Sequence, residues 1–224
     1  MRRSEGHNRP SAPFRATVIG MVSGAAARLG RIKGAAFREF IAYYRATYGP
    51  EALIAVVAAM PAIHRRELDQ RDAALGVLAS EWYPAEVVHA LLDEISRGKS
   101  EAALRALAAT ASGAVMRATL RGLYRKLFEW MATPERYARY GPKLWGTYYD
   151  SGEVVVEVVP GELAAISTVR NWRSHHPLIC ELNRGASVEI YGAMGCVDVK
   201  AERAQCVSRG DPHCRFVTRW SSQS

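Results

Sequence analysis

The chain has 224 residues and a mass of 24.7 kDa, enough for one domain of ordinary size or two small ones with a substantial hydrophobic core. Hydrophobic residues make up 49% of it, and no apolar run approaches the roughly 20 residues that cross a bilayer, so we expect no membrane span. A formal charge of +8 raises the question of nucleic acid. No recognition-helix signature, zinc-finger spacing or aromatic ribonucleoprotein motif accompanies this charge. A solvated basic face is therefore favoured, and a nucleic acid partner is not expected.

The first 17 residues are expected to form a disordered basic arm, because four arginines and two prolines lie there beside a single acidic residue. The apolar stretch over residues 18–27 resembles a secretion signal only superficially. Glycines interrupt it, and it runs into arginines without a convincing cleavage site. We therefore expect a cytoplasmic protein.

From about Gly34 to Tyr149 the sequence is rich in Ala and Leu and shows the periodicity of amphipathic helices. The residues expected to begin or end these helices are Gly49, Pro50, Pro61, Pro84, Gly98, Ser100 and Pro134. The clearest expected apolar stripes are Phe37, Phe40, Ile41 and Tyr44 in the first helix, and Val87, Val88, Leu91, Leu92 and Ile95 in the third. Residues 18–149 are thus predicted to be a helical region.

From Gly152 the period changes to two or to continuous β-branched runs. The expected elements are strands over 153–159 and 162–169, a helix from Pro177 to about Met194, and strands over 196–206 and 214–220. Helices followed by two hairpins that flank one helix predict an α+β fold with an antiparallel sheet. Residues 150–224 would form its α+β portion, and 18–224 can also form a single domain.

Three of the four cysteines can meet at one point. Cys206 and Cys214 are symmetric about Gly210, so a hairpin that turns there places their side chains roughly 5 Å apart on one face. Cys180 lies in the first turn of the preceding helix, where the partial positive charge of the helix N-terminus favours the thiolate. Three thiolates suit zinc, which normally has a fourth ligand.

The fourth ligand is not defined by spacing. Glu202 and His213 are the nearby candidates, and Cys196 is expected in the core. Two alternatives to a metal stay open at this point, namely thiols that simply pack in the core and a disulfide between Cys206 and Cys214.

The stretch Cys206-Val-Ser-Arg-Gly-Asp-Pro-His-Cys214-Arg-Phe216 resembles the closing motif of the 4-vinyl-reductase-type domain, and the helix from His176 to Gly192 resembles the helix before that motif. This domain occurs in the sensor modules of aromatic-responsive transcriptional activators. It is similar to trafficking subunits of the TRAPP complex and is related to the haem-nitric-oxide sensor fold. In the phenol-sensing members, one cysteine of the helix and two of the hairpin bind zinc with a glutamate. The resemblance thus implies zinc on Cys180, Cys206 and Cys214.

The chain departs from this pattern at the glutamate. The family glutamate is expected about three residues before the first hairpin cysteine, where this chain has Arg203. Glu202 is offset by one position, which puts it on the other face of a strand unless a bulge intervenes. A second resemblance, to an uncharacterised paralogous family expanded in myxobacteria, covers the chain from about Lys33 and implies little about activity.

Members of this superfamily commonly hold an apolar molecule between the helices and the sheet. The residues expected to line such a space are Trp130, Trp145, Tyr148, Tyr149, Trp172, His175 and His176. The alternative is that these side chains fill the core and that His175 and His176 flank the helix.

Catalytic motifs are missing from the sequence: it has no Gly-rich phosphate loop, no Gly-x-Ser-x-Gly and no His-Glu-x-x-His. A zinc shell filled by protein ligands leaves no position for a catalytic water, so the metal would be structural. The sequence favours a non-enzymatic sensor or regulatory module that binds a small hydrophobic molecule or a protein partner, and a homodimer is expected. The alternatives are an enzyme related to tetrapyrrole vinyl reductases and a basic nucleic-acid-associated protein.

Overall fold

The computed structural model describes residues 29–119 and 133–223. The expected basic arm, the apolar stretch after it and Trp130 lie outside the described residues. The helical part contains β1 (Arg31–Lys33), α1 (Gly34–Tyr48), α2 (Pro50–Ala59), α3 (Ala62–Arg65), β2 (Trp82–Pro84), α4 (Ala85–Ser96), α5 (Glu101–Thr119) and α7 (Pro134–Tyr148). None of the described helices is long and apolar enough to cross a membrane.

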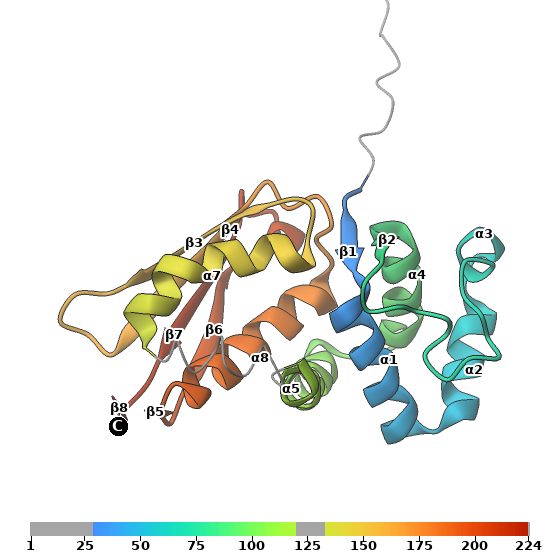
Figure 1. Cartoon of the computed structure of the whole chain (residues 1–224), viewed down its shortest axis with the longest axis horizontal. Helices are drawn as coiled ribbons and strands as arrows, with labels where there is room; N and C mark the ends of the chain where they lie inside the picture. Colours follow the sequence, from blue (N-terminus) through green and yellow to red (C-terminus); the bar gives the residue numbers. More distant parts are fainter. Residues whose placement is uncertain (1–28, 120–132, 224) are drawn as a thin grey trace, which may run out of the picture.

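The second part contains β3 (Glu153–Val158), β4 (Ala164–Arg170), α8 (Pro177–Ala193), β5 (Cys196–Val197), β6 (Lys200–Gln205), η1 (Val207–Arg209), β7 (Cys214–Arg219) and β8 (Ser222–Gln223). The four longer strands form one antiparallel sheet in the order β3-β4-β7-β6. This confirms the predicted α+β fold, with two hairpins that flank one helix. In Figure 1 the sheet and α7 lie at one end, α2, α3 and α4 lie at the other, and α5 and α8 lie between them.

The predicted apolar stripes form the core of the helical part. All four predicted stripe residues of α1 and all five of α4 are buried. Gly49 ends α1 with a φ angle of +92°, and Gly98 ends the turn after α4 with a φ angle of +71°. Such positive φ angles favour glycine over residues with a Cβ atom. Ser100 accepts a hydrogen bond from the backbone N–H of Ala103, as expected of a residue that caps α5.

The short pair β1–β2 was not predicted. Ile32 pairs with Tyr83, and Pro84 is the last residue of β2 instead of a residue in the first turn of α4. Strands of three residues are too short to show a period of two, so the sequence carries little signal for them. This pair fixes the start of α1 against the start of α4.

α8 packs closely on α5 because Gly185 faces Ser112. A Cβ atom at Gly185 would lie 2.5 Å from the Ser112 hydroxyl oxygen and 2.8 Å from its Cβ. The Ser112 hydroxyl lies 2.8 Å from the carbonyl oxygen of Leu182 on α8. The contact therefore needs both a glycine at position 185 and the hydroxyl group of Ser112.

We predict that Gly185→Ala lowers the free energy of unfolding by about 1–3 kcal/mol, because the added methyl group forces α5 and α8 apart. Chemical denaturation of the full chain measures this change. Gly192→Ala is the matched control on the same helix, since no atom lies within 4 Å of the place that its added methyl group would take. It should be neutral or stabilising by up to about 1 kcal/mol, and equal losses in both variants would contradict the packing argument.

Candidate functional site

The three predicted cysteines meet, and His175 joins them. The Sγ atom of Cys180 lies 3.6 Å from that of Cys206 and 3.8 Å from that of Cys214, and the last two are 3.9 Å apart. The Nε2 atom of His175 lies 3.4 Å from the Cys206 sulfur. The four ligand atoms all lie within 4.8 Å of one another, and the cysteines are fully buried. We call these four residues the Cys/His cluster.

Three separate segments build the cluster. The loop after β4 carries His175, the first turn of α8 carries Cys180, and the β6–β7 hairpin carries Cys206 and Cys214. The hairpin turns at Gly210, which has a left-handed conformation with φ of +88°. The Asp211 carboxylate accepts a hydrogen bond of 2.8 Å from the backbone N–H of Cys206 and holds the turn together.

The structure does not bring Glu202 to the cluster. The register of β6 against β7 shifts between Arg203 and Gln205, so a bulge does intervene before Cys206. The bulge places Arg203 on the face of Cys206, and a guanidinium nitrogen lies 3.8 Å from the sulfur. Glu202 lies on the opposite face, 76% exposed, with its carboxylate 3.8 Å from Arg219. His213 is also outside the cluster, and Cys196 packs among buried residues that include Tyr191 and Trp220.

Hydrogen bonds distinguish the cysteine thiols from one another. Contacts with the thiols of Cys180 and Cys214, and then with His175 and Ser208, hold the pKa of Cys206 well below its usual range. Contacts with the thiols of Cys206 and Cys214, and then burial, raise the pKa of Cys180. Metals bind the thiolate, and a thiol with a low pKa gives up its proton readily to form it. All four cysteines of the chain are free thiols in this structure.

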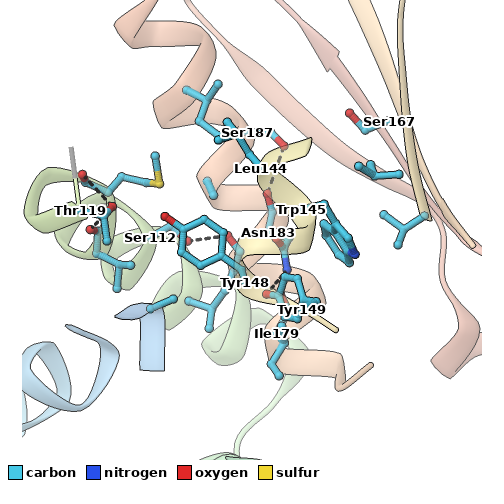
Figure 2. A pocket seen from close by; sticks show the side chains of 18 of the residues that line it. Ser112, Thr119, Leu144, Trp145, Tyr148, Tyr149, Ser167, Ile179, Asn183 and Ser187 are labelled. Atoms are coloured by element: carbon cyan, nitrogen blue, oxygen red, sulfur yellow. Dashed lines mark hydrogen bonds between the residues drawn. The ribbon is translucent and has the colours of Figure 1, made fainter. Parts of the chain in front are cut away.

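A cavity of about 230 Å³ lies between the helices and the sheet, beside the Cys/His cluster. Trp145, Tyr148 and Tyr149, three of the residues predicted to line a pocket, lie on its wall (Figure 2). Trp172 does not line it but is buried behind Trp145 and Tyr149. His176 does not line it either, and its place in the structure is at the start of α8.

The cavity wall is largely apolar, and Asn183 is one of its few polar side chains (Figure 2). Its amide nitrogen donates hydrogen bonds to the Tyr149 hydroxyl, at 3.0 Å, and to the Ile179 carbonyl, at 2.9 Å. Burial raises the pKa of Tyr149, so its hydroxyl keeps its proton. Asn183 was not identified from the sequence. The available signal was a polar residue on the same face of α8 as Ile179 and Leu182.

The loop that carries His175 is anchored on α4. His176 caps α8, since its Nδ1 accepts a hydrogen bond from the Leu178 N–H, and its Nε2 lies 3.1 Å from the Asp93 carboxylate. The ring of His89 packs on that of His176, and its Nε2 donates to the Ser174 carbonyl at 3.2 Å. Burial lowers the pKa of both histidines, so both are neutral in the folded protein near pH 7.

The fold is similar to that of solved H-NOX proteins. The Fe(II) unliganded H-NOX protein from K. algicida gives a TM-score of 0.61 at 13% sequence identity, covering 86% of this chain and 98% of that one. An H-NOX protein from S. oneidensis in the Fe(II)NO ligation state gives 0.55 at 10% identity, covering 85% and 100% of the two chains. An oxygen-binding H-NOX domain related to soluble guanylate cyclases gives 0.55 at 11%, covering 86% and 96%. The sequence matches no protein-family model and no curated protein. The chain therefore shares the fold of H-NOX domains.

The described residues do not fit haem, the cofactor named for the H-NOX family. Histidine and cysteine are common axial ligands of haem iron, and neither is among the described residues that line the cavity. Met116 does line it, but methionine binds haem iron together with a histidine, which the described lining does not offer. The described lining also contains no lysine or arginine to pair with haem propionates. Burial raises the pKa of the lining residue Tyr137 to about 12, which disfavours the phenolate that would bind iron. We derive no haem chemistry for this cavity.

The two neutral histidines predict a dependence of stability on pH. Their pKa values are lower in the folded protein than the unfolded value of about 6.5, so below that pH the unfolded chain binds more protons. The free energy of unfolding should fall as the pH drops from about 7.5 through 6.5 towards the folded pKa values. His89→Gln keeps a donor for the Ser174 carbonyl but does not titrate, so its loss of stability between about pH 7.5 and about pH 5.5 should be smaller. Denaturation curves at the two pH values measure both, and identical losses in the variant and the wild type would contradict this assignment.

Proposed function

We propose that this protein is a non-enzymatic sensor or regulatory module. A small apolar molecule with one hydrogen-bonding group occupies the cavity, and a structural zinc ion held by the Cys/His cluster stabilises the wall beside it. The single observation that carries the proposal is a set of three thiols and one imidazole within 4.8 Å of one another, with two of the thiols on α8 and β7, which also line a cavity with a largely apolar wall.

The spacing of the sulfur atoms supports zinc. Zinc–sulfur bonds of about 2.3 Å in a tetrahedron place the sulfur atoms about 3.8 Å apart, and a zinc-bound imidazole nitrogen lies about 3.5 Å from each sulfur. The three sulfur–sulfur distances of 3.6, 3.8 and 3.9 Å match this spacing, as does the 3.4 Å from His175 to Cys206. His175 therefore replaces Glu202 as the proposed fourth ligand.

Four protein ligands close the zinc shell. A closed shell has no open position for a catalytic water or substrate, which is the mark of structural zinc sites. The resemblance of the hairpin to the 4-vinyl-reductase-type domain supports the same reading. The zinc would then tie the loop after β4, α8 and the β6–β7 hairpin into one unit.

The cavity wall supports an apolar ligand. Described residues from α1, α5, α7, α8 and the sheet line it, and none of them is charged. Asn183 and Tyr149 provide one polar spot, with an amide oxygen that can accept and a phenol that can donate a hydrogen bond. Pockets of this kind orient a largely apolar ligand through a few polar groups. The shared fold with H-NOX proteins, some solved with NO or oxygen, supports a sensor over an enzyme. A second copy of this chain in a homodimer, or another regulatory protein, would receive the signal.

The purified protein should contain one zinc ion per chain. Cys206→Ser should abolish zinc binding and lower the free energy of unfolding by more than about 4 kcal/mol, the range seen when a structural metal is lost. Native mass spectrometry with elemental analysis measures the metal. Cys196→Ser is the matched control, because that cysteine is buried outside the cluster and its loss should leave zinc in place.

The identity of the fourth ligand is tested by a second pair of variants. His175→Ala should weaken zinc binding by at least about ten-fold, and Glu202→Ala should leave it unchanged. A folded wild-type protein that takes up no zinc would refute the structural metal.

Filling the cavity should block ligand binding. Ala186 lies on the cavity wall, whereas Ala193 is exposed at the end of α8. We use 1-naphthol, an aromatic molecule with one hydroxyl group, as the probe. Ala186→Leu should weaken its binding by at least about ten-fold because the added side chain occupies the ligand volume, and Ala193→Leu should bind as the wild type does. Isothermal titration calorimetry measures both, and equal affinities in the two variants would place the binding site elsewhere.

A further inference from the structure

Trp172 lies between the Cys/His cluster and the cavity. Its indole is 7% exposed, and the His175 ring stands edge-on to it, with ring centroids 5.1 Å apart and an interplanar angle of 90°. On its other side it contacts Trp145 at 4.9 Å and Tyr149 at 5.2 Å. One side chain thus touches a proposed zinc ligand and two residues of the cavity wall.

Trp172 thus connects the proposed zinc site, through His175, to the cavity wall, through Trp145 and Tyr149. At one end, the His175 Nε2 lies 3.4 Å from the Cys206 sulfur. At the other end, Trp145 and Tyr149 line the cavity, and the Tyr149 hydroxyl accepts the hydrogen bond of Asn183. The rings of Trp145 and Tyr149 also pack on each other, with centroids 4.3 Å apart.

The rings have little room to move independently. The Trp172 N–H donates to the Ser174 hydroxyl at 3.0 Å, and the Trp145 N–H donates to the Ser151 carbonyl at 3.1 Å. Gly152 passes so close that a Cβ atom there would lie 3.2 Å from the Trp145 indole nitrogen and 3.2 Å from the Trp172 Cβ. Side chains packed at this density transmit a displacement instead of absorbing it. A ligand that presses on Trp145 or Tyr149 must therefore act on Trp172 and, through it, on His175.

The backbone brings the two sites together as well. Cys180 follows the cavity residue Ile179 on α8, and Asn183 lies one turn further on. Cys214 and the cavity residue Phe216 are two positions apart on β7 and share a face of the sheet. The cluster and the cavity thus share α8 and β7.

We propose that ligand binding in the cavity and zinc binding in the Cys/His cluster are energetically coupled through Trp172. A ligand held against Trp145 and Tyr149 fixes Trp172, which fixes His175 in its zinc-binding position and tightens the zinc site. By thermodynamic linkage, bound zinc raises the affinity for the ligand by the same factor. This inference rests on the proposed function and adds communication between its two sites.

The test measures the dissociation constant of zinc for the full-length protein by competition with a chromophoric chelator, with and without saturating 1-naphthol. In the wild type, 1-naphthol should tighten zinc by about five-fold or more, the lower end of typical coupling between sites. In Trp172→Leu the dissociation constant of zinc should be the same with and without 1-naphthol, although zinc and 1-naphthol both still bind. Trp220→Leu is the matched control, because Trp220 is equally buried, at 7% exposed, and packs with Tyr191 away from the cluster. Trp220→Leu should keep the wild-type ratio between the zinc dissociation constants without and with 1-naphthol.

The outcomes separate the inference from the proposed function. If the wild type binds neither zinc nor 1-naphthol, the proposed function fails and the coupling falls with it. If it binds both with a ratio of one, only the coupling is refuted. A ratio that persists in Trp172→Leu would mean that the sites communicate by another route, and it would overturn the role of Trp172. If Trp172→Leu does not fold, Trp172→Phe, which keeps a ring but loses the Ser174 hydrogen bond, should reduce the ratio, and an unchanged ratio would refute the route.

Discussion

Three segments of the chain converge on one point because three thiols and an imidazole meet there within 4.8 Å. Thiols are weak hydrogen-bonding groups, so their mutual contacts alone stabilise little. The spacing of their sulfur atoms is the one that a zinc ion would need, and a zinc ion would convert these contacts into four strong bonds. The rest of the C-terminal part depends on this convergence. Cys214 pairs with Val169 of β4, so the cluster lies at one end of the strand pairing that joins the two hairpins into one sheet.

The cavity follows from the same arrangement. α8 presents Cys180 to the cluster and Ile179, Leu182 and Asn183 to the space under the sheet. Its close contact with α5 at Gly185 lets the two helices form one continuous wall. A buried amide is costly unless its hydrogen bonds are made, and Asn183 directs its donors to Tyr149 and Ile179. The amide oxygen is then the acceptor that this polar spot can offer to a ligand.

The sequence predicted the features that have a strong local signal. The apolar stripes of α1 and α4 and the hairpin symmetry about Gly210 both follow from periodicity and turn chemistry, and the structure contains them. His175 was considered for the pocket and not for the metal, because the direction of a loop side chain depends on tertiary contacts with α4. Glu202 was expected to need a bulge to reach the cluster; the bulge exists, between Arg203 and Gln205, but it brings Arg203 and not Glu202 to the face of Cys206. Pairs as short as β1–β2 carry no periodicity to detect.

The domain that the hairpin resembles has a glutamate where this chain has Arg203, and in the proposed centre His175 would take the place of that ligand. Both differences would make the centre less negative. Zinc with three thiolates carries one net negative charge, and a carboxylate as the fourth ligand would add another inside the protein. A neutral imidazole adds none. The Arg203 guanidinium, with its side chain only 8% exposed, contacts the Cys206 sulfur and lies 3.2 Å from the buried Glu181 carboxylate. It can therefore offset the charge of the proposed centre without binding the metal. A carboxylate in place of Arg203 would face both Glu181 and the thiolates, so an arginine at the position that the bulge brings to the cluster fits a proposed centre whose fourth ligand is the neutral imidazole of His175.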